Sequence, residues 1–473
     1  MSRTHLLGTA SAAALACISS FAFAQSVTAI QGGGSTLAKY DYAAAPYVIN
    51  GTTYTSEMSL YNSTTSGYPF STYWASGSGV GQQSFLNNDL TCDINKVTGN
   101  NGGACGNTPG GTNTVHYGAS DATLSSSQEA TWATNSYGQT LSRDLIQLPS
   151  MGVGIAIPVQ NHNVTTNGSI QLSDHDLCEI FSGGFSDFSQ ITDSNPRPQA
   201  GTIDVVYRSD GSGTSFLLTN HLGFNNNGSY ICTPGTDTPA GFTFSATTKF
   251  ATLFGSGNYS CDSTSGLCTI TGGPLAGRSF GENGGGAVQT ELESLTSAVG
   301  YISPDFTSLD TTSADTSTLV DAAVFQGTHA YLPTTALITA ALAKGTTGDT
   351  NLNPPTTATA GADPNAWVPL LGKVTAGYPI VGYTTFDVAQ CYADPNAASA
   401  VIAFLSDHYN NSSYTAIQSD NGFVQVSKSG ASKFLEAINS HILGNTGSVK
   451  KQWNDNIQNS LFCGTGHNQF PGR

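Results

Sequence analysis

The sequence predicts an α/β protein made of two lobes. Short β-forming runs alternate with runs of helical apolar spacing along most of the chain. The clearest example is the strand-like run 202–206, which a Gly/Ser turn connects to the apolar helical segment 216–222. Removal of an N-terminal leader from the 473 residues leaves about 449, which is more than one hydrophobic core serves comfortably.

The first 24 residues are predicted to be a signal peptide. Arg3 precedes a small and apolar run without acidic residues, and Ala22-Phe23-Ala24 provides the small residues that a signal peptidase needs. We expect cleavage after Ala24 and a periplasmic or secreted mature protein. A lipoprotein anchor at Cys17 is the alternative, but the leucine before it lies one place from the usual position. No later apolar run reaches the ~18–20 residues that span a bilayer, so we expect the mature protein to be soluble.

Two apolar runs are expected to connect the lobes. The run 145–159 is typical of a buried strand that leaves the first lobe, and 378–383 is typical of the returning strand. These crossings predict lobe I at 25–152 plus 376–473 and lobe II at 153–375. Other expected elements are helices at 174–182, 287–295, 335–343, 397–408 and 431–443 and strands at 205–206 and 299–302. The Thr/Ala/Pro-rich stretch 308–362 is interpreted as a variable connection around the short helix 335–343.

The turn after the strand 202–206 has the composition of an anion-binding loop, Arg208-Ser209-Asp210-Gly211-Ser212-Gly213-Thr214-Ser215. The first N–H groups of a helix lack intrahelical partners and carry the positive end of the helix dipole, so they attract anions. Gly211 and Gly213 allow the backbone to approach a ligand closely. Ser212 and Thr214 add hydroxyl donors, and Arg208 supplies a planar charged fork. The alternative is an ordinary strand–loop–helix connection with a solvent-facing arginine.

Compatible motifs recur in order along the chain, namely Gly33-Gly34-Ser35-Thr36-Leu37, Gly77-Ser78-Gly79, Gly118-Ala119-Ser120-Asp121 and the segment 208–214. This ordered set resembles the periplasmic phosphate-binding proteins of phosphate-specific ABC transport, and in particular their DING subgroup. Further shared stretches are 177–183, 300–306, 363–369, 377–380 and 390–394. The resemblance covers most of the mature chain and is weaker at 93–113, 225–275 and 306–360. The Asp-Ile-Asn-Gly start of the subgroup is replaced by Ala29-Ile30-Gln31-Gly32.

The resemblance implies the type 2 periplasmic-binding-protein fold, in which two lobes joined by two crossing strands close on a ligand in the cleft. It implies phosphate as that ligand, held by Thr36, Leu37, Ser78, Asp121, Arg208, Ser212, Gly213 and Thr214. Hydroxyls, backbone N–H groups and the Arg208 guanidinium would donate to phosphate, whereas Asp121 would only accept. A carboxylate suits the proton of hydrogen phosphate and repels fully ionised sulfate. Asp210 is expected to orient Arg208, and the alternative for Asp121 is a plain turn carboxylate.

Eight of the nine cysteines lie beyond the leader, and an even number in an exported chain favours disulfides. Cys92 with Cys105, and Cys261 with Cys268, each bracket a Gly/Ser/Asn-rich loop, so local pairing is physically easy. The sequence alone leaves other connectivities open. The resemblance implies these two pairs together with Cys178–Cys232 and Cys391–Cys463. A metal site would need CxxC pairs or Cys/His clusters, which the sequence lacks, so no metal is expected.

The charge balance excludes one class of partner. The chain has 15 basic and 31 acidic residues, a net charge of −16, and so lacks the basic surface that binds nucleic acid. A buried site can still bind phosphate, because local dipoles and hydrogen bonds act over a few ångströms and salt screens the outer charges beyond ~8 Å. We expect a monomer that needs no cofactor. The resemblance implies the permease of a phosphate ABC transporter as a partner.

Three functions are compatible with the sequence. The first is high-affinity phosphate capture for uptake, without enzymatic activity. The second is a secreted DING-like alkaline phosphatase, which would need an activated nucleophile or bound metals. The nearest candidate cluster, Asp174-His175-Asp176, is more typical of a polar helix start. The third is an extracellular surface or adhesion protein on the same fold, which suits a chain with only 10% charged residues.

Overall fold

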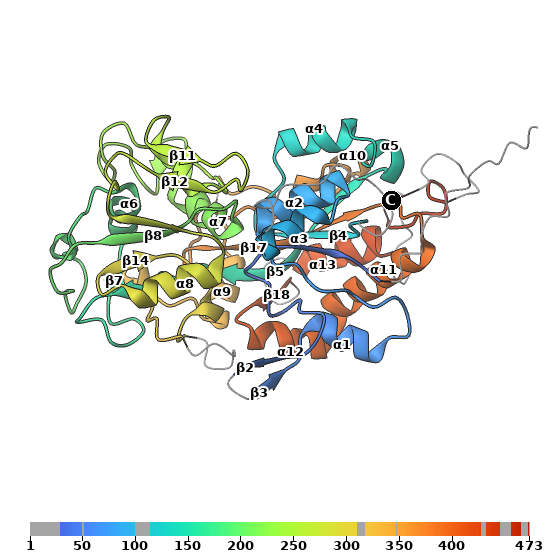
Figure 1. Cartoon of the computed structure of the whole chain (residues 1–473), viewed down its shortest axis with the longest axis horizontal. Coiled ribbons are helices and arrows are strands. Elements are labelled where there is room, and N and C mark those ends of the chain that lie inside the picture. Colours follow the sequence, from blue (N-terminus) through green and yellow to red (C-terminus); the bar gives the residue numbers. More distant parts are fainter. Residues whose placement is uncertain are drawn as a thin grey trace, which may run out of the picture.

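The computed structural model describes residues 29–49, 52–99, 114–309, 317–346, 348–426, 432–444, 456–464 and 472. The predicted signal peptide at 1–24 lies outside these ranges. The described chain forms two α/β halves that lie side by side, with β5 (Leu145–Gly154) and β17 (Val381–Ala389) near their junction (Figure 1). Within the described ranges, no helix is both long enough and apolar enough to span a bilayer.

The first half is built on a five-stranded mixed sheet with the strand order β1–β4–β17–β5–β18. β1 (Gly32–Gly34) and β4 (Tyr117–Ser120) run parallel, whereas β17, β5 and β18 (Val424–Gln425) join through antiparallel pairs. The helices of this half are α1 (Glu57–Thr64), α2 (Ser78–Asn87), α3 (Thr91–Thr98), α4 (Ser126–Thr134), α5 (Gln139–Ser142), α11 (Pro395–Asn410), α12 (Ser412–Asp420) and α13 (Ser432–Ala437). Because β17 pairs with both β4 and β5, early and late parts of the chain share one sheet.

The second half is built on a four-stranded sheet with the strand order β13–β8–β14–β6. β13 (Ser279–Glu282), β8 (Asp204–Arg208) and β14 (Ala298–Gly300) are parallel, and β6 (Val159–Gln160) closes one edge antiparallel. This half also holds α6 (Asp174–Ser182), α7 (Gly213–Leu222) and α8 (Gly285–Ser294) (Figure 1). Short hairpins pair β2 (Tyr47–Ile49) with β3 (Thr52–Tyr54), β9 (Asn225–Asn226) with β10 (Ser229–Tyr230), and β11 (Tyr259–Cys261) with β12 (Cys268–Ile270).

The two segments that connect the halves hydrogen-bond to each other. The Ile155 N–H donates to Ile380 O at 3.0 Å, and the Tyr378 hydroxyl donates to Ile155 O at 2.5 Å. Beyond this point the first segment enters the second half, where Ala156 bridges Ile302. These residues are buried, so the connection lies inside the apolar core. The lobe boundaries expected at 152/153 and 375/376 stay predictions.

Local signals in the sequence explain where α6 begins and ends. The Asp176 N–H donates to Ser173 Oγ at 3.2 Å, and the Ser173 N–H donates to the Asp176 side chain at 2.8 Å, which forms a capping box. The helix ends at Gly183, whose φ of 85° lies in the left-handed region that glycine adopts without strain. The helix predicted at 174–182 is confirmed with these bounds.

Three expectations about the elements need correction. The stretch 308–362 contains α9 (Thr335–Leu342) as expected, but also α10 (Ala358–Gly361) and a hairpin of β15 (Ala323–Gln326) and β16 (His329–Tyr331). β15 pairs with β7 (Gln171–Leu172), a contact across more than 150 residues that the local sequence does not reveal. The returning strand starts at Val381 and continues to Ala389, because it pairs with two neighbours. The helix expected at 431–443 is α13 followed by a π-helical turn, Ile438–Ile442.

Three disulfides lie within the described residues, Cys178–Cys232, Cys261–Cys268 and Cys391–Cys463. They join the cysteines that the resemblance pairs. Cys92 is also disulfide-bonded, and its expected partner, Cys105, lies outside the described residues. The three bonds close sequence separations of 54, 7 and 72 residues respectively.

These loop lengths predict how strongly two of the bonds stabilise the fold. In the chain-entropy account, closing a separation of 54 residues contributes ~4 kcal/mol and closing one of 7 residues contributes ~2 kcal/mol. We expect a Cys178→Ser/Cys232→Ser variant to unfold at a lower urea concentration than a Cys261→Ser/Cys268→Ser variant, and both below wild type. Urea unfolding followed by circular dichroism measures the order, and the reverse order would contradict the account.

Candidate anion-binding site

The first part of the site is the carboxyl edge that β1 and β4 share. The strands are parallel with Gly34 opposite Ala119, so Ser35 and Asp121 leave the sheet side by side. The Ser35 N–H continues the ladder to Ala119 O at 2.9 Å. Gly34 has a φ of 138°, and a Cβ there would lie 1.9 Å from Ala119 O. The glycine run of the sequence motif is therefore required by close backbone packing at this edge.

Asp121 is a buried carboxylate held by two serines. Only 3% of the residue is exposed. Ser35 Oγ donates to Oδ1 at 2.6 Å and to Oδ2 at 2.8 Å, and Ser78 Oγ donates to Oδ2 at 3.1 Å. Burial raises the pKa of Asp121 to about 6, while the two serine hydroxyls and the positive charge of Arg208 act in the opposite direction. The carboxylate is therefore ionised above about pH 6. The serine hydroxyls favour this charged form because they replace part of the hydration that burial removes.

Ser78 is placed by the start of α2. Gly77 precedes the helix with a φ of 99°, and its N–H donates to Gly34 O at 2.7 Å. A Cβ on Gly81 would lie 2.3 Å from Gly34 Cα, so the first turn of α2 packs directly on the backbone of β1. This packing brings the positive end of the α2 dipole next to Asp121.

Arg208 and α7 come from the second half. Arg208 is the last residue of β8, and its Nε and Nη2 donate to Asp210 Oδ1 and Oδ2 at 2.7 and 2.6 Å. This bidentate pair fixes the guanidinium plane and leaves the Nη1 donors outside the pair. Burial raises the pKa of Asp210, but the charge and hydrogen bonds of Arg208, the charge of Lys96 and the Gly284 N–H together lower it overall. Ser212 then caps α7 by accepting the Ser215 N–H at 3.3 Å.

The two halves meet at these motifs. The Gly79 N–H donates to Gly211 O at 3.0 Å. A Cβ on Gly213 would lie 2.5 Å from Asp121 Oδ2 and 2.6 Å from Ser78 Oγ. The N-terminus of α7 therefore faces the Asp121 carboxylate across the junction, and glycine at position 213 is what allows that approach.

Comparison with known proteins identifies the family of this chain. Residues 44–407, more than half of the chain, match the family model described as the PBP superfamily domain. The chain belongs to the PBP superfamily. A relative named alkaline phosphatase L, from Pseudomonas aeruginosa PAO1, is 30% identical over 369 residues, which are 77% of this chain and 81% of the relative. A relative named phosphate-binding protein, from an unknown prokaryotic organism, is 31% identical over 444 residues, which are 88% of this chain and 97% of the relative.

Solved structures in the PBP superfamily extend the likeness to nearly the whole chain. The crystal structure of a DING protein matches with a TM-score of 0.64 and 27% identity, and covers 94% of this chain and 99% of its own. A high affinity periplasmic phosphate-binding protein, PfluDING, bound with phosphate at pH 8.5, matches with a TM-score of 0.65 and 26% identity over the same shares. The resemblance to DING-type phosphate-binding proteins and the type 2 periplasmic-binding-protein fold are confirmed.

Six of the eight residues that the resemblance assigns to phosphate lie at or beside the junction. They are Ser78, Asp121, Arg208, Ser212, Gly213 and Thr214. Thr36 is half-buried, and its Cγ2 would lie 3.9 Å from a Cβ on Gly284 at the start of α8. The Leu37 N–H, which the resemblance assigns to phosphate, donates to Ser35 Oγ at 3.1 Å. Ser78 likewise directs its hydroxyl to Asp121. The phosphate contacts of all eight residues stay predictions.

Sequence reasoning missed three side chains that hold the site. Ser35 donates to Asp121, and the Tyr73 hydroxyl donates to Ser35 O at 2.7 Å. The Tyr301 hydroxyl accepts the Arg208 N–H at 3.1 Å. Ser35 and Tyr301 lie inside the shared motifs, but a motif does not tell which neighbour a side chain contacts. Tyr73 lies outside every motif, and no sequence signal points to it.

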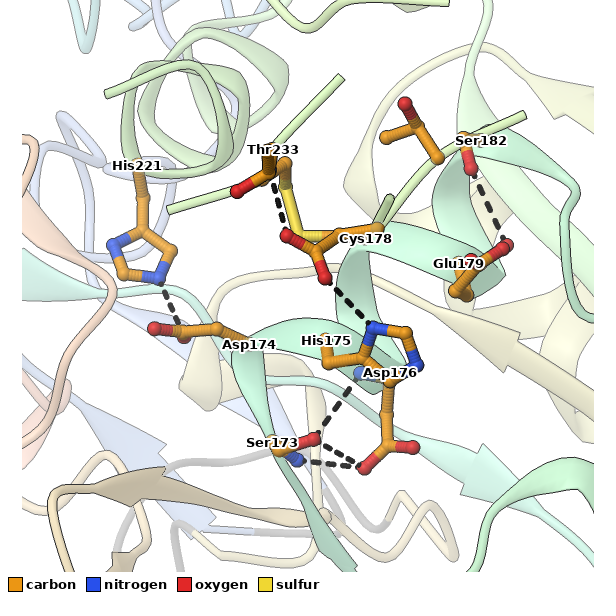
Figure 2. Close-up of a disulfide and its surroundings, with 12 residues drawn as sticks. Ser173, Asp174, His175, Asp176, Cys178, Glu179, Ser182, His221 and Thr233 are labelled. Atoms are coloured by element: carbon orange, nitrogen blue, oxygen red, sulfur yellow. Dashed lines mark hydrogen bonds and ion pairs between the residues drawn. A yellow bond between two sulfur atoms is a disulfide. The ribbon is translucent and has the colours of Figure 1, made fainter. Parts of the chain in front are cut away.

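The cluster Asp174-His175-Asp176 has a structural explanation, as Figure 2 shows. Asp174 pairs with His221 at 3.2 Å, and His175 pairs with Asp237 at 3.0 Å. Asp176 instead caps α6 through Ser173. The three side chains contact different partners beside the Cys178–Cys232 disulfide. Among all residues that the structure describes, no group of three or more His, Cys, Asp or Glu side chains is arranged to hold a metal ion.

The buried charge of Asp121 predicts a pH-dependent cost to stability. The pKa of Asp121 is about 6 in the folded chain, above the ordinary value of 3.8. Between these two pH values the folded chain binds more protons than the unfolded chain, so the free energy of unfolding falls as the pH rises from 3.8 to about 6. Asp121→Asn carries no such charge. Without ligand, we expect this variant to be about 1–3 kcal/mol more stable than wild type at pH 8, with the difference shrinking toward pH 4. Urea unfolding at both pH values measures this, and an equal difference at both would contradict it.

Proposed function

We propose that this chain binds inorganic phosphate with high affinity at the junction of its lobes and has no enzymatic role. One observation carries the proposal: a buried acceptor, Asp121, lies opposite the α7 N-terminus and near the positive charge of Arg208. The names of the relatives support it, since one is a phosphate-binding protein and a solved neighbour holds phosphate.

The donors at the junction match an oxyanion. Arg208 is held by Asp210 through Nε and Nη2, so its Nη1 group supplies charged donors to phosphate. Ser212 Oγ accepts the Ser215 N–H, which leaves the Ser212 proton for the ligand. The first N–H groups of α7, at Gly213 and Thr214, add backbone donors and the positive dipole end.

Asp121 supplies the selectivity. An ionised carboxylate has no proton to donate, so it requires a protonated oxygen on the ligand. Hydrogen phosphate provides that proton at neutral pH, whereas sulfate presents only oxygens with negative charge. Sulfate would therefore place an unprotonated, negatively charged oxygen against the buried carboxylate, which is costly at a site with so little exposed surface.

We base the proposed cellular role on the predicted signal peptide and on the family of the chain. The predicted signal peptide and the periplasmic phosphate-binding relatives support a periplasmic or secreted protein that passes phosphate to the permease of an ABC transporter. Its net charge of −16 opposes approach of an anion only modestly, because salt screens charges beyond ~8 Å. We propose that it works as a monomer.

Phosphatase activity is the second candidate, because relatives are named alkaline phosphatase L. Away from the junction, a serine, a histidine and a glutamate are hydrogen-bonded in series, as in a catalytic triad. Ser150 Oγ contacts His408 Nε2 at 3.0 Å, and His408 Nδ1 contacts Glu57 Oε2 at 2.6 Å. At most 1% of each of these residues is exposed, and Ser150 also contacts the Tyr42 hydroxyl. A substrate cannot reach this serine, so we assign the network to the packing of α1 and α11 on β5.

Isothermal titration calorimetry of the purified mature protein at pH 7.5 tests the proposed function. We expect phosphate to bind at one site per chain and sulfate to give no saturable heat at the same concentrations. The physical reason is the repulsion between the Asp121 carboxylate and an unprotonated sulfate oxygen. Comparable heats for the two anions would contradict the assignment, and no phosphate heat would favour the extracellular surface or adhesion function.

Two glycine variants locate the binding in the same experiment. A Cβ at position 213 would lie 2.4 Å from Asp121 Cβ, whereas a Cβ at position 79 would have its nearest neighbour at 3.4 Å, an ordinary contact. We expect Gly213→Ala to weaken phosphate binding by about 1–3 kcal/mol, because the lobes can no longer approach. Gly79→Ala is the matched control and should bind like wild type. Equal losses in both variants would place the site elsewhere.

Hydrolysis of p-nitrophenyl phosphate by wild type, Asp121→Ala and Arg208→Ala proteins tests the second candidate. We expect no turnover from the junction, because it is complementary to the free anion and Asp121 would face an ester oxygen without a proton. Arg208→Ala should also lose ~3–5 kcal/mol of phosphate affinity, since it removes the charge partner of a buried anion. Hydrolysis in wild type that disappears in both variants would overturn the binding-only role.

A further inference from the structure

Ser35 contacts Asp121 more closely than any residue of the predicted phosphate set. It lies directly after β1 and is fully buried. Its Oγ is 2.6 Å from Asp121 Oδ1 and 2.8 Å from Oδ2, whereas Ser78 Oγ is 3.1 Å from Oδ2. The resemblance gives Ser35 no role, so this contact needs its own explanation.

The hydrogen-bond partners of Ser35 fix the direction of its proton. Ser35 Oγ accepts the Leu37 N–H at 3.1 Å, which occupies a lone pair and turns the O–H toward the carboxylate. The backbone of Ser35 is held as well, since its N–H donates to Ala119 O at 2.9 Å and its carbonyl accepts the Tyr73 hydroxyl at 2.7 Å. Ser35 therefore donates to Asp121 from a fixed position.

Ser78 and Ser35 lie differently with respect to the second lobe. Ser78 Oγ and Asp121 Oδ2 are among the atoms closest to a Cβ on Gly213, so they face the α7 N-terminus. Oδ1, which has the shortest bond to Ser35, is not among these atoms. An anion at the junction can draw the Ser78 hydroxyl away from Asp121, but the Ser35 hydroxyl stays on the carboxylate.

We propose that Ser35 is a positioning residue that holds the Asp121 carboxylate through Oδ1 and so presents Oδ2 as the acceptor for the protonated oxygen of phosphate. This inference rests on the proposed function. It makes Ser35 a determinant of selectivity for protonated oxyanions, although it does not contact the ligand.

The groups that face Asp121 give this role a pH signature. Arg208 is the charged group opposite, Tyr73 is the nearby titratable group, and Ser35 and Ser78 are the hydroxyl donors. Burial raises the pKa of Asp121 to about 6, and the Ser35 hydroxyl opposes that rise. Loss of this hydroxyl removes a hydrogen bond to the charged form, so the pKa should move further up, by about one unit. A protonated Asp121 donates instead of accepting, and it no longer requires a proton on the ligand.

Phosphate and sulfate dissociation constants between pH 5.5 and 8.5, for wild type and Ser35→Ala, test the proposal. At pH 8.5, where Asp121 is ionised in both proteins, we expect Ser35→Ala to bind phosphate about threefold more weakly, because the carboxylate is no longer held through Oδ1. The loss of affinity on acidification should begin about one pH unit higher in Ser35→Ala, so its affinity relative to wild type should fall by a further factor of about three near pH 6.5 and about eight at pH 5.5. Discrimination against sulfate should fall over the same range. The titration of phosphate itself is common to both proteins and cancels in the comparison.

Two further variants control the experiment. Ser35→Cys keeps the size of the side chain but has a weak donor, so it should shift the profile in the same direction even if Ser35→Ala folds poorly. Ser120→Ala removes a buried hydroxyl at the same sheet edge that, within the described residues, hydrogen-bonds to the Ala122 backbone and not to Asp121, and its profile should match wild type. Profiles of the Ser35 variants that run parallel to wild type would overturn the positioning role. Failure of wild type to bind phosphate at any pH would instead overturn the proposed function.

Discussion

The site depends on how the Asp121 carboxylate is compensated after burial. A carboxylate removed from water is costly unless donors replace its hydration. Here the Ser35 and Ser78 hydroxyls provide them, and Arg208 adds a positive charge from the opposite lobe. These groups follow β1, begin α2 and end β8 respectively. Two donors therefore come from one lobe, and the positive charge of the second lobe completes the compensation where the lobes meet.

Close backbone contacts make that closed arrangement possible. Gly34 brings β1 against β4, and Gly213 brings α7 against Asp121. A side chain at either position would overlap the opposite atoms, so the glycines of the sequence motifs serve packing as much as ligand approach. The direct bond from the Gly79 N–H to Gly211 O shows that the Gly/Ser turns of the two lobes touch. The positive ends of α2 and α7 consequently lie close together beside Asp121.

The sequence predicted the two-lobed α/β fold, the family and the motifs at the junction, because these rest on local patterns. The helix at 174–182 could be placed because Ser173 and Gly183 mark its ends. Contacts between distant residues were beyond local reasoning. Ser35 and Asp121 are 86 residues apart, and only the parallel register of β1 and β4 brings them together. The strand β15 was missed for the same reason, since its partner β7 lies far earlier in the chain.

A crystal structure of the mature protein grown with phosphate near pH 8 would show whether the junction holds the anion. We expect one phosphate between the lobes, with one oxygen within hydrogen-bonding distance of Asp121 Oδ2 and others contacting the Arg208 guanidinium and the first N–H groups of α7. We also expect Ser35 to remain bonded to Asp121. Phosphate bound away from this junction, or a junction that stays closed and excludes phosphate, would contradict the account.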